Sequence, residues 1–205
     1  MFPRSRRRAV TRAAGLVIVL GLLVAACGST FDPTGPCTAD GSAPGAYPEL
    51  EATVPTLFRD AKPSDLDSGR ACTPTGLGPL AAHGVKELRF AGGTWSTGTD
   101  SGISLAIFTN VNGPPLDPAW LTEFFETGAR AGKNVTSVDT SDYPIAPGIT
   151  GRRIDVLNGE SYQSIVVWEQ DAHVAAALIG NFIREIQTKE AHDVVVRAAV
   201  DTLAR

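Results

Sequence analysis

Cysteine is the residue type with the most definite chemistry in this chain. A thiol can be alkylated or acylated, oxidised to a disulfide, or used as a soft metal ligand. The chain has three, Cys27, Cys37 and Cys72. No two of them stand in a Cys-x-x-Cys arrangement, so their spacing supports neither a thioredoxin-like redox site nor a zinc site. The residues around each cysteine must therefore indicate its reaction.

The segment before Cys27 has the two parts of a secretory signal. Five arginines lie within the first twelve residues, and the apolar run 13–26 follows them. This run is shorter than the roughly 20 residues that a transmembrane helix needs to cross a bilayer. We therefore expect residues 1–26 to be a cleaved signal peptide rather than a permanent span. Residues 5–10 also partly resemble a twin-arginine export signal, but Ala9 stands where that pattern favours a bulky apolar residue, so the export route stays open.

The end of the apolar run resembles the lipobox of bacterial lipoproteins. Leu-Val-Ala-Ala at 23–26 places small residues immediately before Cys27. The resemblance implies a diacylglycerol thioether on Cys27, cleavage after Ala26, and acylation, for instance by palmitate, of the new amino terminus. Two or more acyl chains hold a protein stably at a membrane. We expect a lipoprotein anchored at the extracytoplasmic face of the bacterial cell membrane.

Processing at Cys27 changes the charge of the chain. Removing residues 1–26 leaves 179 residues, in which 13 Lys and Arg face 22 Asp and Glu, for a formal net charge of −9. This excess of acid argues against binding nucleic acid or anionic headgroups through a basic surface. The length suits a single domain with a sizeable core, so we expect a tether over 27–48 and one domain over 49–205.

Cys37 and Cys72 remain after Cys27 is assigned to lipid. An exported location is one where disulfides form and persist, so we predict that these two cysteines pair; two free thiols are the alternative. In the chain-entropy model, closing a loop of this length contributes about 3 to 4 kcal/mol. The bridge by itself would leave about nine residues free between the lipid and the fold.

One pair of segments invites a catalytic interpretation. Residues 81–83 and 100–102, Ala-Ala-His and Asp-Ser-Gly, are similar to the histidine and serine segments of trypsin-like proteases. In those enzymes a whole β-barrel separates the two residues, whereas His83 and Ser101 are only 18 apart, and Gly84 stands where the family has cysteine. A catalytic triad is defined by the geometry of its side chains and not by short stretches of similar sequence. We therefore interpret Ser101 as a polar residue of a turn.

Metal ligation also lacks a supporting pattern. None of the three histidines has another histidine or a cysteine at metal-ligand spacing; they are His83, His173 and His192. We expect no metal and no other cofactor.

Periodicity predicts the elements of the domain. An apolar period of two favours the first two of five strands, and the last three form a meander with an Asn-Gly turn at 158–159. Asp117 before Pro118 is typical of a helix N-cap, with Leu121, Phe124 and Phe125 on one stripe as far as about Gly132. The C-terminal segment places Val196, Ala199, Val200 and Leu203 at helical spacing. The expected strands cover 88–90, 103–108, 151–157, 162–169 and 174–179.

Strands grouped with two longer helices predict an α+β fold, an antiparallel sheet of about five strands with helices packed on one face. For function we favour a non-catalytic, membrane-anchored module that binds a ligand or partner or assembles with one. The alternatives are an extracytoplasmic hydrolase whose site is assembled in space, and a carrier of an apolar ligand. The expected partners are the membrane, through the lipid, and a protein or apolar ligand.

Overall fold

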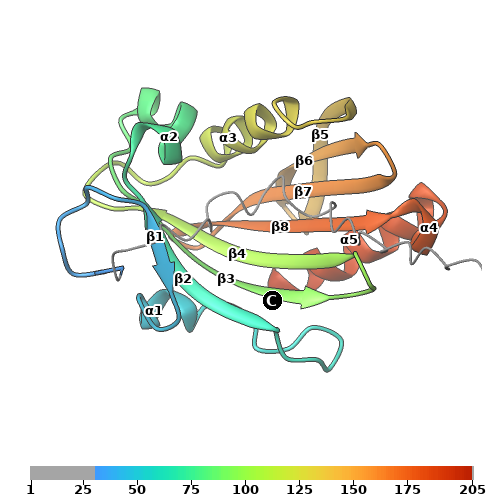
Figure 1. Cartoon of the computed structure of the whole chain (residues 1–205), viewed down its shortest axis with the longest axis horizontal. Coiled ribbons are helices and arrows are strands. Elements are labelled where there is room, and N and C mark those ends of the chain that lie inside the picture. The colour runs from blue at the N-terminus through green and yellow to red at the C-terminus, as the bar shows by residue number, and fades with distance from the viewer. Residues whose placement is uncertain (1–30, 205) are drawn as a thin grey trace, which may run out of the picture.

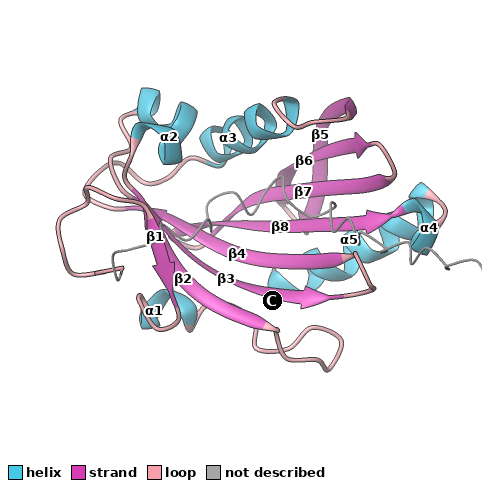
Figure 2. Ribbon diagram, in the orientation of Figure 1, coloured by secondary structure: helices cyan, strands magenta, loops and turns pink. Residues whose placement is uncertain are grey.

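A single antiparallel sheet organises the molecule. The computed structural model describes residues 31–204, which form an eight-stranded sheet with helices on both of its faces (Figures 1 and 2). The signal peptide predicted over 1–26 and the predicted lipid-bearing Cys27 lie outside the described residues. Within the described part, no helix combines the length and apolar character needed to cross a membrane.

Helices separate most strands in the first half of the described chain, whereas the last four strands follow one another without a helix. The strands are β1 (Gly41–Ala43), β2 (Asp65–Ala71), β3 (Leu88–Ser96), β4 (Gly102–Asn110), β5 (Val135–Ala146), β6 (Ile149–Asn158), β7 (Ser161–Gln170) and β8 (His173–Phe182). The helices are α1 (Pro48–Glu51), α2 (Pro74–Leu77), the 3-10 helix η2 (Gly78–His83), α3 (Pro118–Arg130), α4 (Ile183–Ile186) and α5 (Lys189–Leu203).

The strand order reveals two meanders joined side by side. The order is β1-β2-β3-β4-β8-β7-β6-β5, and every neighbouring pair is antiparallel. The first meander, β1 to β4, meets the second, β5 to β8, where β4 pairs with β8 and Leu105 lies opposite Ala177. Helix α3 connects the two halves. The edge strands are therefore β1 and β5, at opposite ends of the sheet.

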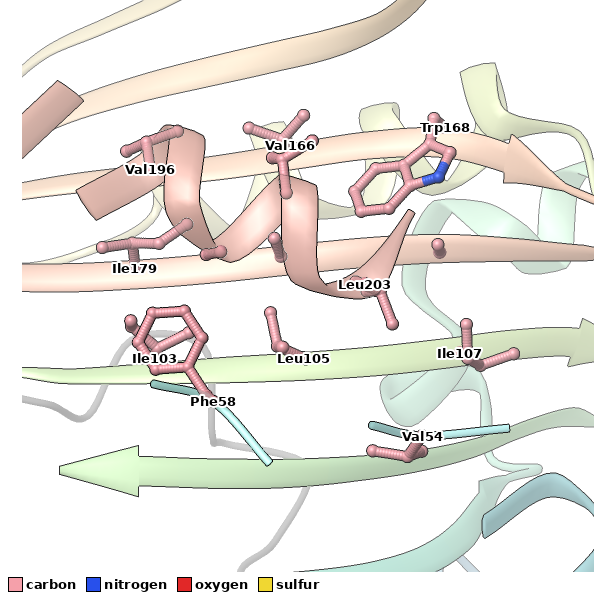
Figure 3. Packing of buried hydrophobic residues seen from close by; sticks show 14 of the residues in the cluster. Val54, Phe58, Ile103, Leu105, Ile107, Val166, Trp168, Ile179, Val196 and Leu203 are labelled. Carbon is pink, nitrogen blue, oxygen red and sulfur yellow. The ribbon is translucent and has the colours of Figure 1, made fainter. Parts of the chain in front are cut away.

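Both faces of the sheet are covered, so the prediction of helices on one face is wrong. Alternate residues of a strand point to opposite faces, and in β7 both kinds are buried: Ile165 packs beneath α3, and Val166 packs beneath α5. The first face carries α2, η2 and α3, and the second carries α1 and α5. Figure 3 shows the core on the second face, where Leu203 and Val196 of α5 lie over strand residues.

The predicted sheet of about five strands is also wrong, because three strands lack a hydrophobic period. Strand β5 reads Val-Thr-Ser-Val-Asp-Thr-Ser-Asp-Tyr-Pro-Ile-Ala, and of its residues only Ile145 is buried. Charges and proline are the usual features of a protected edge strand. Strand β2 contains two aspartates, a serine and a glycine, and β1 is three residues long. None of the three has an alternating apolar pattern, although β2 is buried from Ser68 to Ala71.

The predicted start of α3 is confirmed. Asp117 caps the helix, accepting a hydrogen bond at Oδ1 from the amide of Ala119 at 2.8 Å, and Pro118 occupies the first turn. Leu121 and Phe125 are buried in the core, whereas Phe124 is only partly buried against it. The apolar stripe is therefore real, and Phe124 lies at its border.

Candidate functional site

A buried polar network joins α5 to the second meander. His192 of α5 lies between Ser164 of β7 and Asn181 of β8. Its Nε2 is 2.9 Å from Ser164 Oγ, and its Nδ1 is 2.8 Å from Asn181 Oδ1. Thr188 caps the helix by accepting a hydrogen bond from the amide of Ala191 at 3.2 Å, which fixes the first turn that carries His192. These polar residues occupy the α5 side of the sheet, beside the apolar core.

Charged residues surround this network on the side of β6. Arg153 donates a hydrogen bond to Ser164 Oγ at 3.1 Å and another to Asp155 at 2.8 Å, and it also pairs with Asp193. Lys189 approaches Asp155 at 3.3 Å and Asp193 at 3.2 Å. Two cations therefore face two carboxylates, so the buried guanidinium of Arg153 is paired, as burial of a charge requires.

Burial determines the charge of His192. Burial first, and the positive charge of Arg153 second, lower the pKa of the imidazole to about 4, against the opposing effect of Asp155 and Asp193. The ring is therefore neutral at neutral pH and carries one N–H. The Ser164 hydroxyl has a single proton with two acceptors in reach, His192 and the Asp155 carboxylate. The ring tautomer follows from which of the two receives it.

The arrangement of Ser164, His192 and Asn181 has the connectivity of a nucleophile, a base and an orienting group. Its location prevents that use in this structure. The exposed fraction is 0% for Ser164 and 1% for His192, so a substrate cannot reach the hydroxyl. What the geometry does is hold α5 in register on β7 and β8. Sequence analysis missed the network because its three members come from three separate elements and form no local motif.

The histidine and serine considered for protease chemistry do not pair. Ser101 is buried, hydrogen bonds to Glu185 of α4, and accepts a hydrogen bond from the amide of Phe182 at 3.2 Å. His83 instead bonds to Glu123 of α3 at 2.7 Å and stacks on Trp120, with ring centroids 4.9 Å apart. Ser101 fastens the β3–β4 turn to α4, and His83 links η2 to α3.

The predicted disulfide between Cys37 and Cys72 is confirmed. It joins the segment before β1 to the end of β2, and the two Cα atoms are 5.4 Å apart. Asp40 fixes the same junction, because its carboxylate accepts hydrogen bonds from the amides of Cys72 at 2.6 Å and Thr73 at 2.8 Å. Residues 31–37, which we call the N-terminal arm, are thus attached to the domain at their C-terminal end.

Arg70 holds the rest of the N-terminal arm. This residue of β2 is 5% exposed and donates hydrogen bonds to the carbonyl oxygens of Gly35 at 2.9 Å, Asp32 at 3.1 Å and Pro36 at 3.0 Å. Backbone carbonyls are good partners for a guanidinium, which presents five N–H donors in a fixed plane. The attachment therefore extends from the disulfide back to Asp32.

Comparisons with known proteins add no family to these observations. No protein-family model matches the chain, and no curated protein matches it. Over residues 31–204, no group of three histidine, cysteine, aspartate or glutamate side chains is placed to hold a metal ion. The geometry of the N-terminal arm and of the buried network is therefore what bears on function.

Proposed function

We propose that this chain is a bacterial lipoprotein, anchored through lipid on Cys27 to the extracytoplasmic face of the cell membrane. The observation that carries the proposal is the Cys37–Cys72 disulfide, which lies ten residues after the lipobox-like sequence. Disulfides persist in the oxidising space outside the cytoplasmic membrane and are rare inside it. The bridge and the lipobox-like sequence independently favour the same compartment.

The domain acts as a non-catalytic module that binds a ligand or partner or assembles with one. In support, the Ser164–His192–Asn181 set is enclosed beneath α5, and Ser101 and His83 each bond to a different partner. Nucleophilic catalysis by a serine needs a hydroxyl that a substrate can approach. A sheet with an apolar core on each face is instead suited to hold a binding surface for a ligand or partner in a fixed shape.

Metabolic labelling tests the anchor. Cells that express the full chain are fed an alkyne-bearing palmitate analogue, and membrane and soluble fractions are compared. The chain should incorporate the label and fractionate with membranes, and Cys27→Ala should lose both properties. A double variant, Cys37→Ala with Cys72→Ala, is the matched control and should keep the label, because it removes two cysteines but not the lipid site. A labelled, membrane-bound Cys27→Ala chain would disprove the anchor.

An extracytoplasmic hydrolase is the second candidate, and the hydrogen-bond connectivity of Ser164, His192 and Asn181 favours it. Opening of α5 would be needed to expose the hydroxyl. A fluorophosphonate probe, which reacts with activated serines, distinguishes the two candidates. We expect no labelling of the purified protein. Labelling that Ser164→Ala abolishes and Ser101→Ala leaves intact would support the hydrolase and refute the non-catalytic binding module.

A further inference from the structure

The N-terminal arm limits the distance between the lipid and the fold. Phe31 is the first described residue, and only residues 28–30 separate it from Cys27. Four residue steps span at most about 14 Å when fully extended. Arg70 and the disulfide hold the arm on the domain. The residues of the arm therefore do not lengthen the tether between Cys27 and the domain. The position of the arm therefore fixes where the domain meets the membrane.

The arm and the beginning of β3 form one corner of the molecule. The Phe31 ring lies 5.7 Å from the Arg70 guanidinium, and Arg70 is 4.0 Å from Glu87. Cys37 Sγ lies 3.9 Å from the carbonyl oxygen of Lys86. In Figure 1 the blue start of the described chain lies beside β1, at the opposite end of the sheet order from β5.

The charge of this corner differs from that of the whole chain. The mature chain has a formal net charge of −9, but the corner contains as many cations as anions: Arg70, Lys86 and Arg89 against Asp32, Asp40 and Glu87. Lys86 is exposed. Placing this corner near lipid phosphates therefore avoids the repulsion that the acidic remainder of the surface would meet.

We propose that this corner, consisting of the N-terminal arm with Lys86 and Arg89, rests on the phospholipid headgroups. The inference depends on lipid attachment at Cys27, as proposed above. The headgroup layer of one leaflet is roughly 5 to 7 Å thick, so a reach of about 14 Å leaves at most about 9 Å of water, close to the Debye length of about 8 Å at physiological salt. The domain is thereby held in one orientation, with the β5 edge directed away from the membrane.

Chemical anchoring tests this orientation separately from bacterial lipidation. The mature chain, residues 27–205 with its disulfide formed, is coupled through the free Cys27 thiol to a maleimide lipid in phosphatidylcholine vesicles. A bulky, membrane-impermeant amine reagent is then applied, and each labelled lysine is quantified by mass spectrometry. Lys86 labelling should fall by more than half on anchoring. Lys133 is also exposed. It precedes β5, which is five strand spacings from β3 in the sheet order, or roughly 24 Å at about 4.8 Å per strand, and it should keep its rate.

A longer tether is the matched control. Inserting about 20 Gly/Ser residues between Gly28 and Ser29 allows a mean span of roughly 25 Å, and Lys86 should then label as fast as in the chain free in solution. Equal Lys86 labelling in the short-tether and long-tether chains would overturn the proposed orientation, as would equal protection of Lys86 and Lys133. Because coupling is chemical, these outcomes do not depend on whether the cell lipidates Cys27.

Discussion

Protonation of His192 should link the stability of the protein to pH. An unfolded histidine binds a proton near pH 6.5, but burial lowers the pKa of His192 in the folded protein to about 4. Between these two values the unfolded state binds a proton that the folded state does not. The free energy of unfolding should therefore be fully retained above pH 6.5 and decrease as the pH falls from 6.5 toward 4.

The size of this effect follows from the two pKa values. Each pH unit of separation is worth about 1.4 kcal/mol, so the full separation corresponds to roughly 3 kcal/mol. Restricted to the interval from about pH 7 to about pH 4.5, the loss should be about 2.5 kcal/mol. Against a total stability of about 5 to 15 kcal/mol, such a loss is easily measured.

Urea titrations of residues 27–205 bearing Cys27→Ser, followed by circular dichroism, provide the assay. His192→Gln is the matched variant, because glutamine keeps polar atoms in the network but does not titrate. The pKa of Asp193 is lowered by its hydrogen bonds from Arg153 and Lys189, against the effect of burial, so its stabilisation is lost only as the pH falls below its ordinary value of about 4. Other carboxylates contribute equally to the free energy of unfolding of both chains, so their contributions cancel when the two chains are compared.

The reasoning fails if the two chains lose the same free energy of unfolding between about pH 7 and about pH 4.5. Parallel curves would mean that His192 is protonated in the folded protein, with Asp155 and Asp193 outweighing its burial. A curve for His192→Gln that is flatter than that of the parent by about 2.5 kcal/mol would support a neutral, buried ring.

Three further predictions concern the core, the disulfide and an exposed ion pair. Phe125→Ala should destabilise the protein by about 3 to 5 kcal/mol and Phe124→Ala by clearly less, because only the first ring is buried; equal thermal shifts would contradict this packing. Replacing both Cys37 and Cys72 with alanine should lower the free energy of unfolding by about 3 to 4 kcal/mol, and an unchanged urea midpoint would contradict a stabilising bridge. Glu123→Ala should cost no more than about 1 kcal/mol, because its pair with His83 is half exposed; a larger drop in melting temperature would mean that this contact holds η2 on α3.

Elements with a buried apolar face could be predicted from the sequence, because burial produces a periodic pattern of apolar residues. Strands that are held mainly by backbone pairing could not be predicted in this way. The α3 cap could be located because Asp117 and Pro118 act locally. Strand β5 left no such sign: it pairs with β6 along almost its whole length, and only one of its side chains, that of Ile145, is buried. An apolar period of two indicates which face of a strand is buried. An edge strand whose faces are both polar has no such period.

The sequence contained a sign that helices cover both faces of the sheet. Ile165 to Trp168 in β7 and Val174 to Ala177 in β8 are continuous apolar runs. A strand with one solvated face alternates, whereas a strand buried on both faces does not need to. These runs therefore indicated a layer on each side of the sheet, and the amphipathic C-terminal helix supplied the second layer. The Ser164–His192 contact follows from that placement and could not be anticipated without it.

The N-terminal arm illustrates a kind of packing that composition conceals. Glycine, proline and small polar residues dominate the segment 28–48, and such residues ordinarily bury too little surface to offset the entropy of ordering. Here the buried Arg70 binds the carbonyl oxygens of the arm, so attachment depends on the main chain that every sequence has. Loss of Arg70 would leave these three carbonyl oxygens without their protein donor and would loosen the arm, which would then be held by the disulfide at Cys37 and by the hydrogen bond from the Tyr47 hydroxyl to the carbonyl oxygen of Pro33 at 3.4 Å. The position of the arm on the domain therefore depends on a strand residue outside the arm itself.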